Sequence, residues 1–129
     1  MILMMRTDSP TAELYLYESN NEVARSVWEA HRTLARDLLQ QCEALCESAS
    51  SSLSDVTAII IYKGPGSFTG LRIGCTVANT LAYSQSIPIV GVSGDAWKSD
   101  GLTRLDDGHN DKSVIPDYGA EPRITVQQK

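Results

Sequence analysis

The chain has no apolar run long enough to cross a membrane and no excess of basic residues. None of its apolar runs reaches the ~18 residues of a membrane-spanning helix, and its first run, Met1–Met5, precedes its charges, unlike a secretory signal. Its 11 Lys and Arg residues stand against 16 Asp and Glu, a net charge of −5. This balance disfavours a protein that grips RNA phosphates by itself, and it favours action through a partner.

Cysteine and histidine are scarce, and their positions argue against a metal site. The three cysteines, Cys42, Cys46 and Cys75, lie in segments with helical patterns. Neither His31 nor His109 stands at metal-ligand spacing from them. We therefore expect the cysteines to be small buried apolar residues. Their number and placement fit a protein of the reducing cytoplasm.

The chain also lacks the signatures of phosphate-binding and nucleophilic sites. Its glycine-rich segment, Gly64–Gly74, has no Gly-Lys pair of a Walker A loop and no Gly-x-Gly-x-x-Gly spacing. The turn Gly-x-Ser-x-Gly is absent, and no Ser/His/Asp, Cys/His or paired-carboxylate set stands at convincing spacing. From the residues alone, the segment is a tight strand-to-helix turn with Ser67 or Thr69 as helix N-cap. The sequence predicts no catalytic residue, no metal site and no cofactor of its own.

What the sequence does contain is a succession of strand and helix patterns. Strands are predicted over residues 1–6, 12–18, 23–30, 58–62 and 87–92, and helices over 32–47 and 67–84. The order β-β-β-α-β-α-β predicts an α/β fold with a mixed sheet of about five strands and two main helices. The residues that follow, 94–113, are polar, and we expect them to form a mobile loop.

The second predicted helix carries small residues at every fourth position: Gly70, Gly74, Ala78 and Ala82. Residues four apart lie on one side of a helix, so these four form a flat stripe. We expect the stripe to be exposed and to admit the backbone of a second subunit. Arg72 lies beside the stripe and is expected to contact a carboxylate or phosphate at that interface.

The segment Gly64-Pro-Gly-Ser-Phe-Thr-Gly-Leu-Arg-Ile-Gly74 resembles the hallmark of the bacterial TsaB (YeaZ) family. The strand segment Ile87–Ser93 and the helix after His31 are similar to that family as well. The resemblance covers residues 1–93 and implies a single actin-like (ASKHA, ribonuclease H-like) lobe.

The end of the chain resembles the terminal segment of the same family, through Pro116-Asp-Tyr118 and Pro122-Arg-Ile-Thr125. The resemblance therefore implies three parts: the N-terminal lobe over residues 1–93, the polar loop over 94–113 and a tail over 114–129. It also implies a shortened form that lacks most of the second lobe.

In function, the resemblance implies a non-catalytic subunit of the bacterial tRNA threonylcarbamoyl transferase complex. Such a subunit supports the catalytic subunit TsaD, associates with the ATPase TsaE and meets tRNA only through the complex. Actin-like enzymes have an Asp at the end of the first strand, where this chain has Arg6, so independent ATP binding is not expected. ATP or ADP is expected, if anywhere, at the joint with TsaD.

Two other classes of function stay open on the sequence. One is a homodimeric structural module that uses the same stripe against its own copy. The other is a residual actin-like ATPase or a peptidase. The residues expected at the partner interface belong to the glycine-rich segment, to the helix that follows it and to the start of the first helix. They are His31, Leu34, Leu38, Gly64, Pro65, Gly66, Ser67, Phe68, Thr69, Gly70, Leu71, Arg72, Ile73, Gly74 and Ala78.

Overall fold

The protein forms a five-stranded mixed sheet in a computed structural model that describes residues 1–119. The strands are β1 (Ile2–Arg6), β2 (Thr11–Glu18), β3 (Asn21–Glu29), β4 (Ala58–Tyr62) and β5 (Ile89–Val92). They lie in the order β3-β2-β1-β4-β5. Strands β1, β2 and β3 pair antiparallel, while β4 pairs parallel with both β1 and β5. The predicted mixed sheet is confirmed, and the strand ends shift by at most two residues.

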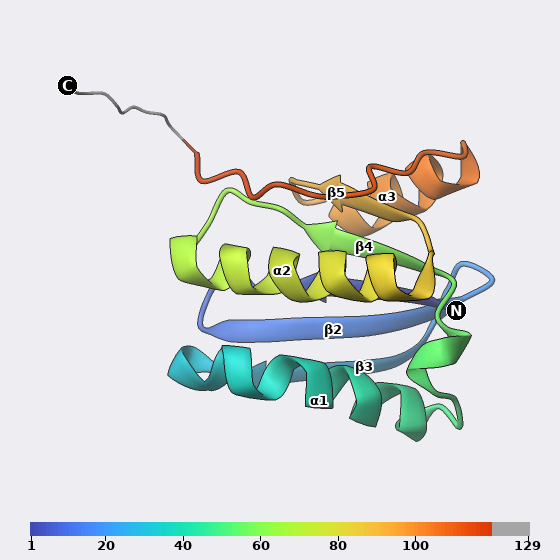
Figure 1. Cartoon of the computed structure of the whole chain (residues 1–129), viewed down its shortest axis with the longest axis horizontal. Coiled ribbons are helices and arrows are strands. Elements are labelled where there is room, and N and C mark those ends of the chain that lie inside the picture. Colours follow the sequence, from blue (N-terminus) through green and yellow to red (C-terminus); the bar gives the residue numbers. More distant parts are fainter. Residues whose placement is uncertain (120–129) are drawn as a thin grey trace.

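Two long helices cover one face of this sheet. Helix α1 (Leu34–Ser48) follows the short 3-10 turn η1 (His31–Thr33), and α2 (Phe68–Gln85) follows β4. They lie side by side in front of the sheet and begin at the same end of the molecule (Figure 1). A second 3-10 turn, η2 (Leu53–Asp55), leads from α1 toward β4.

The core forms two clusters, one on each face of the sheet. Leu3 and Met5 of β1 pack with Leu38, Cys42 and the other inward residues of α1 and α2. Met4, between them in sequence, points to the opposite face, as strand geometry requires. All five residues of β4 are buried, because helices cover both sides of that strand. The three cysteines are free and buried, as predicted.

The prediction of a mobile polar loop over 94–113 is wrong for the centre of that segment. Residues Trp97–Asp106 form α3, which lies on the sheet face opposite α1 and α2. The buried Trp97 ring lies 6.2 Å from the ring of Tyr15 and 6.0 Å from that of Tyr62, centroid to centroid. Gly101 packs so tightly on Ile60 that a Cβ there would collide with it. A few well-placed contacts thus order a helix whose surface is mostly polar.

None of the helices described within residues 1–119 combines the length and the apolar character that crossing a membrane requires.

Candidate partner interface

The small-residue stripe of α2 faces the interior of the molecule. A Cβ on Gly70 would overlap the carbonyl oxygen of Thr7, and one on Gly74 would overlap the Thr7 hydroxyl. Ala78 is fully buried and Ala82 almost so. The prediction that this stripe is exposed and admits a second subunit is therefore wrong.

The neighbour that needs the small residues is the end of the chain's own first strand. Thr7 follows β1 directly, is fully buried and donates a 2.8 Å hydrogen bond from Oγ1 to the carbonyl oxygen of Gly70. That contact is possible because Gly70 and Gly74 let the helix axis come close to the strand. Nothing in the sequence marks Thr7 as the partner of a helix so far along the chain.

The turn that leads into α2 packs on the same strand end. The Ser67 N–H donates to the Asp8 carbonyl oxygen at 2.9 Å, and Gly66 lies so close to Asp8 that it has no room for a side chain. Ser67 occupies the N-cap position of α2, as one of the two predictions had it, although its hydroxyl makes no capping bond. Gly64 has a φ of +124°, which glycine adopts without strain.

The residues predicted to form the interface divide between the interior and the surface. The buried ones cannot touch a partner in this fold; they are Leu34, Leu38, Gly64, Leu71, Gly74 and Ala78. Gly70 and Ile73 are partly buried, and Gly70 is closed off by Thr7. The exposed ones are His31, Pro65, Gly66, Ser67, Phe68, Thr69 and Arg72. For the buried set, the predicted interface role is wrong.

The surface that α2 presents to solvent lies on the side opposite the stripe. We define the outer face as the solvent-facing residues of α2 together with two neighbours on α1: Ala35, Leu39, Arg72, Ile73, Thr76, Val77, Thr80 and Tyr83. Tyr83 is 87% exposed and Leu39 is 45% exposed. A hollow of about 280 Å³ lies between the two helices and is lined by Ala35, Ile73, Thr76 and their neighbours. Most of these residues were missed, although their spacing of three and four was visible in the sequence.

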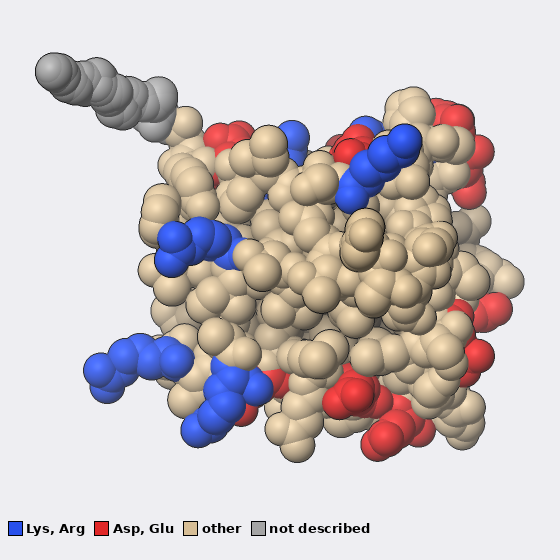
Figure 2. All heavy atoms as spheres, in the orientation of Figure 1, with Lys and Arg blue, Asp and Glu red and all other residues tan. Residues whose placement is uncertain are grey.

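Charge is absent from the middle of the outer face and gathers at its ends. Arg72 is the only charged residue of α2. Figure 2 shows a broad uncharged area over α2, with basic side chains toward the N-terminal ends of both helices and acidic ones over the far half of α1. The sequence places Arg36 in the first turn of α1 and Glu43 and Glu47 toward its end.

The end of β1 is held by an ion pair between Arg6 and Asp8. Arg6 donates two hydrogen bonds to the Asp8 carboxylate, at 2.8 and 3.1 Å, and its guanidinium lies 3.9 Å from the centroid of the Tyr62 ring. The hydrogen bonds to Asp8 raise the pKa of Arg6. The Asp8 carboxylate is thus paired with Arg6, while its carbonyl oxygen accepts from the Ser67 N–H. Within residues 1–119, no three His, Cys, Asp or Glu side chains come together as metal ligands.

Each of the two histidines contacts a charged side chain and not a cysteine. His31 is exposed, has a φ of +48° and lies 3.4 Å from the Glu29 carboxylate. His109 accepts a 3.3 Å hydrogen bond from Arg104. All three cysteine thiols are buried, and burial is the main reason that their pKa values are raised, to about 12 for Cys42. Among the described residues, none of these groups is paired as a nucleophile with a base.

Comparison with known proteins agrees with this fold. A family model described as tRNA N6-adenosine threonylcarbamoyltransferase (TsaD) matches residues 28–95, more than half of the chain. The tRNA threonylcarbamoyladenosine biosynthesis protein TsaB of Bacillus subtilis is 38% identical over 92 residues, which are 71% of this chain and 35% of that protein. TsaB of Escherichia coli is 36% identical over 74 residues, 53% of this chain and 32% of that protein.

A solved structure, YeaZ from Pseudomonas aeruginosa, superposes with a TM-score of 0.68 at 28% sequence identity. The superposition covers 83% of this chain and 49% of that one, and it confirms the single actin-like lobe. The chain spans about a third of the length of these curated relatives and about half of that solved structure. The chain belongs to the family that the matching model describes and, within it, to the TsaB (YeaZ) group.

Proposed function

We propose that this chain is a non-catalytic subunit in tRNA threonylcarbamoyladenosine biosynthesis and that it binds a TsaD-like catalytic subunit through its outer face. The names of its relatives support the pathway, and its similarity to TsaD proteins supports a partner of related fold. The observation that carries the choice of surface is the uncharged outer side of α2.

The side chains of the outer face suit a docking surface. Ile73, Thr76, Val77 and Thr80 are β-branched and lose little rotamer freedom when a partner covers them. They carry no charge whose desolvation would oppose binding. The hollow between α1 and α2 can receive a partner side chain, and the highly exposed Tyr83 offers an aromatic anchor at one end.

The charges at the ends of the face supply orientation. Arg72 near the start of α2 and the glutamates near the end of α1 lie at helix ends whose dipole disfavours their charge, so they do little for the stability of the helices. Arg36, in the first turn of α1, is already paired with Asp37. A partner with carboxylates facing Arg72 and cations facing Glu43 and Glu47 would be steered into one orientation. Arg72 is suited to the planar, two-bond contact that guanidinium groups make with carboxylates.

The remaining roles follow from the same proposal. On this proposal the chain contributes no catalytic group. The Arg6–Asp8 pair supports this, because a guanidinium disfavours a divalent metal at the strand end where the resemblance to actin-like enzymes would put one. ATP or ADP would need groups of the TsaD-like partner and would lie at the joint of the two proteins. A TsaE-like ATPase and tRNA would meet the chain as parts of the assembled complex.

A pair of matched threonine variants tests the proposal. Thr76→Glu places a carboxylate in the middle of the outer face, whereas Thr103→Glu places one at an exposed position of α3, across the sheet. We expect Thr76→Glu to weaken binding to a TsaD homologue by roughly a hundredfold, since an unpaired charge becomes buried. Thr103→Glu should bind like the unaltered chain. Isothermal titration calorimetry measures both, and equal affinities of the two variants would contradict the proposed surface.

A homodimer through the same face is the second candidate, and the charge pattern is what favours it. Two copies with their helices reversed would set the arginines of one against the glutamates of the other. Sedimentation of the chain alone and with the TsaD homologue separates the two cases. A dimer that persists unchanged when the homologue is added would favour the homodimer over the proposed complex.

A further inference from the structure

The segment that follows α3 runs back across the molecule to the glycine-rich turn. We define the strap as residues 109–119. In Figure 1 it passes beside β5 and continues toward the N-terminal end of α2. Its contacts fall into three groups: the edge of β5, the side of α2 and the turn at Gly64.

The first group closes the edge of the sheet. The Ile89 carbonyl accepts from the Asp111 N–H at 2.8 Å, and the Ile89 N–H donates to the Asn110 side-chain oxygen at 3.2 Å. The Gly91 N–H donates to the Asp111 carboxylate at 2.8 Å, and the Gly91 carbonyl accepts from Arg104 at 3.0 Å. These four groups are the ones a neighbouring strand would pair.

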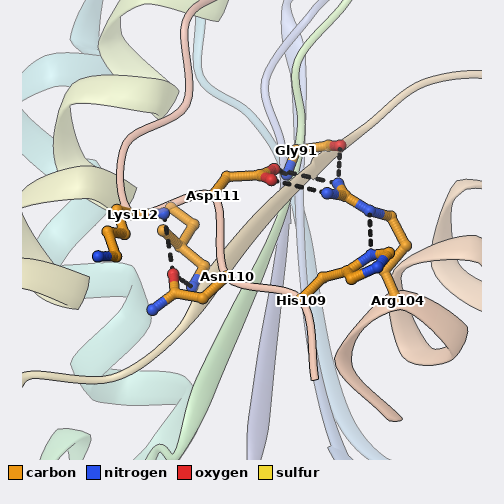
Figure 3. A network of polar contacts seen from close by, with 7 residues as sticks. Gly91, Arg104, His109, Asn110, Asp111 and Lys112 are labelled. Atoms are coloured by element: carbon orange, nitrogen blue, oxygen red, sulfur yellow. Dashed lines mark hydrogen bonds and ion pairs between the residues drawn. The ribbon is translucent and has the colours of Figure 1, made fainter. Parts of the chain in front are cut away.

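An ion pair holds this closure together. Arg104 donates two hydrogen bonds to the Asp111 carboxylate, at 3.0 and 2.6 Å, while the same side chains bind the two backbone groups of Gly91 (Figure 3). The hydrogen bonds from Arg104 lower the pKa of Asp111. The pair therefore acts as a strand residue would, offering one donor and one acceptor to the sheet.

The second group ties the strap to α2. The Asn79 side chain donates to the Val114 carbonyl oxygen at 3.0 Å and accepts from the Val114 N–H at 2.8 Å. The Val114 side chain is buried over Gly91, where a Cβ would collide with it. Asn79 of α2 thus binds both backbone groups of Val114, in the same way that the ion pair binds both backbone groups of Gly91 in β5.

The third group reaches the border of the outer face. The Asp117 N–H donates to the Lys63 carbonyl oxygen at 2.7 Å, and the Asp117 carbonyl passes where a Cβ of Gly64 would stand. The Tyr118 ring then lies 4.3 Å from the Phe68 ring, centroid to centroid. The Arg72 guanidinium lies 5.4 Å from the same Phe68 ring.

We propose that the strap is a surrogate edge strand that closes β5 and holds Phe68 and Arg72 in place for docking. Three anchors in series join the ion pair at one end to the Phe68 ring at the other. Releasing Asp111 from β5 should therefore loosen the contacts of Asp117 and Tyr118 at the other end of the strap. The docking part of this statement rests on the proposed function, whereas the closure of β5 and the coupling of its anchors do not.

The test compares two alanine variants of carboxylates in the same polar stretch. Asp111→Ala removes the anchor on β5. Asp107→Ala is the matched control, because Asp107 is exposed and its carboxylate makes no hydrogen bond within residues 1–119. Hydrogen exchange of the backbone amides is followed by NMR, and affinity for a TsaD homologue is measured by calorimetry.

We expect Asp111→Ala to speed exchange of the Asp117 amide by roughly tenfold or more, because a charge-assisted anchor is lost. Affinity for the homologue should fall several-fold. Asp107→Ala should change neither. Asp111→Asn, which keeps an acceptor for the Gly91 N–H, should lie in between.

If Asp111→Ala speeds hydrogen exchange of the Gly91 amide but not of the Asp117 amide, the proposed coupling between the anchors is wrong. Coupled exchange with unchanged affinity would overturn the role in docking. If Asp111→Ala does not fold, Asn79→Ala tests the middle anchor by the same exchange at Asp117. If the unaltered chain does not bind the homologue, the proposed function fails, and exchange at Asp117 still decides whether the anchors are coupled.

Discussion

The two sides of α2 are built from different residues and meet different neighbours. On the inner side, Gly70 and Gly74 are pressed against the chain's own Thr7, and Ala78 is fully buried. The outer side, with Thr76 and Thr80, faces solvent and carries no charge near its middle. A stripe of small residues therefore reports that something comes close to the helix, but not whether that neighbour belongs to the same chain.

The largest loss of stability is expected from a bulky side chain on the inner side of α2. Gly74→Leu would drive a branched side chain into the buried Thr7, and we expect it to lower the free energy of unfolding by about 3 kcal/mol or more. Urea denaturation followed by circular dichroism measures this. Thr76→Leu, half a turn away on the outer side, is the matched control and should change stability by less than about 0.5 kcal/mol.

The opposite outcome would restore the interpretation drawn from the sequence. If Gly74→Leu kept the stability of the unaltered chain and lost only its affinity for a TsaD homologue, the stripe would be an interface after all.

A smaller loss of stability is expected at high pH, and part of it comes from the buried side of α2, which carries Cys75. Burial raises the pKa of the Cys75 thiol to about 11 and that of Cys42 to about 12, above the ordinary value of 9.0. Folding thus favours the protonated thiols. Their contribution to stability is complete below pH 9 and is lost as the pH rises through 11 to 12.

Thermal unfolding at about pH 8 and about pH 10.5 tests this prediction. We expect a lower midpoint at the higher pH, to which the raised pKa of Tyr15, about 12, also contributes. Replacing Cys75 by Ser should reduce the difference between the two midpoints, and an unchanged difference would show that the thiol does not contribute.

The order of strands and helices could be predicted from the sequence because the periodicity of each element is strong. The all-apolar run Ala58–Tyr62 is the central strand that its composition indicates. The side to which α2 turns its stripe could not be predicted, since both possible neighbours would require small residues. Helix α3 was missed because Trp97, Leu102 and Leu105 are its only large apolar residues, and they lie within a polar segment.

The strap could not be predicted for a different reason. Arg104, Asp111 and Asn79 look like solvated polar residues in the sequence, and their role depends on which backbone groups β5 leaves without a strand. The resemblance of Pro116-Asp-Tyr118 to a family tail indicated a segment of interest but not its place. The second part of that pattern, Pro122–Thr125, lies outside the described residues.

Alkylation of a single introduced thiol tests the central claim most directly. The native cysteines are buried and their pKa values are raised, so at about pH 8 they should react slowly with iodoacetamide. Thr76 is exposed, so the thiol of Thr76→Cys should react readily. We predict that a saturating concentration of a TsaD homologue slows its alkylation roughly tenfold or more. Alkylation of the Thr103→Cys control should be unchanged by the homologue. Equal alkylation rates for Thr76→Cys with and without bound homologue would contradict the claim that the outer face of α2 is the docking surface.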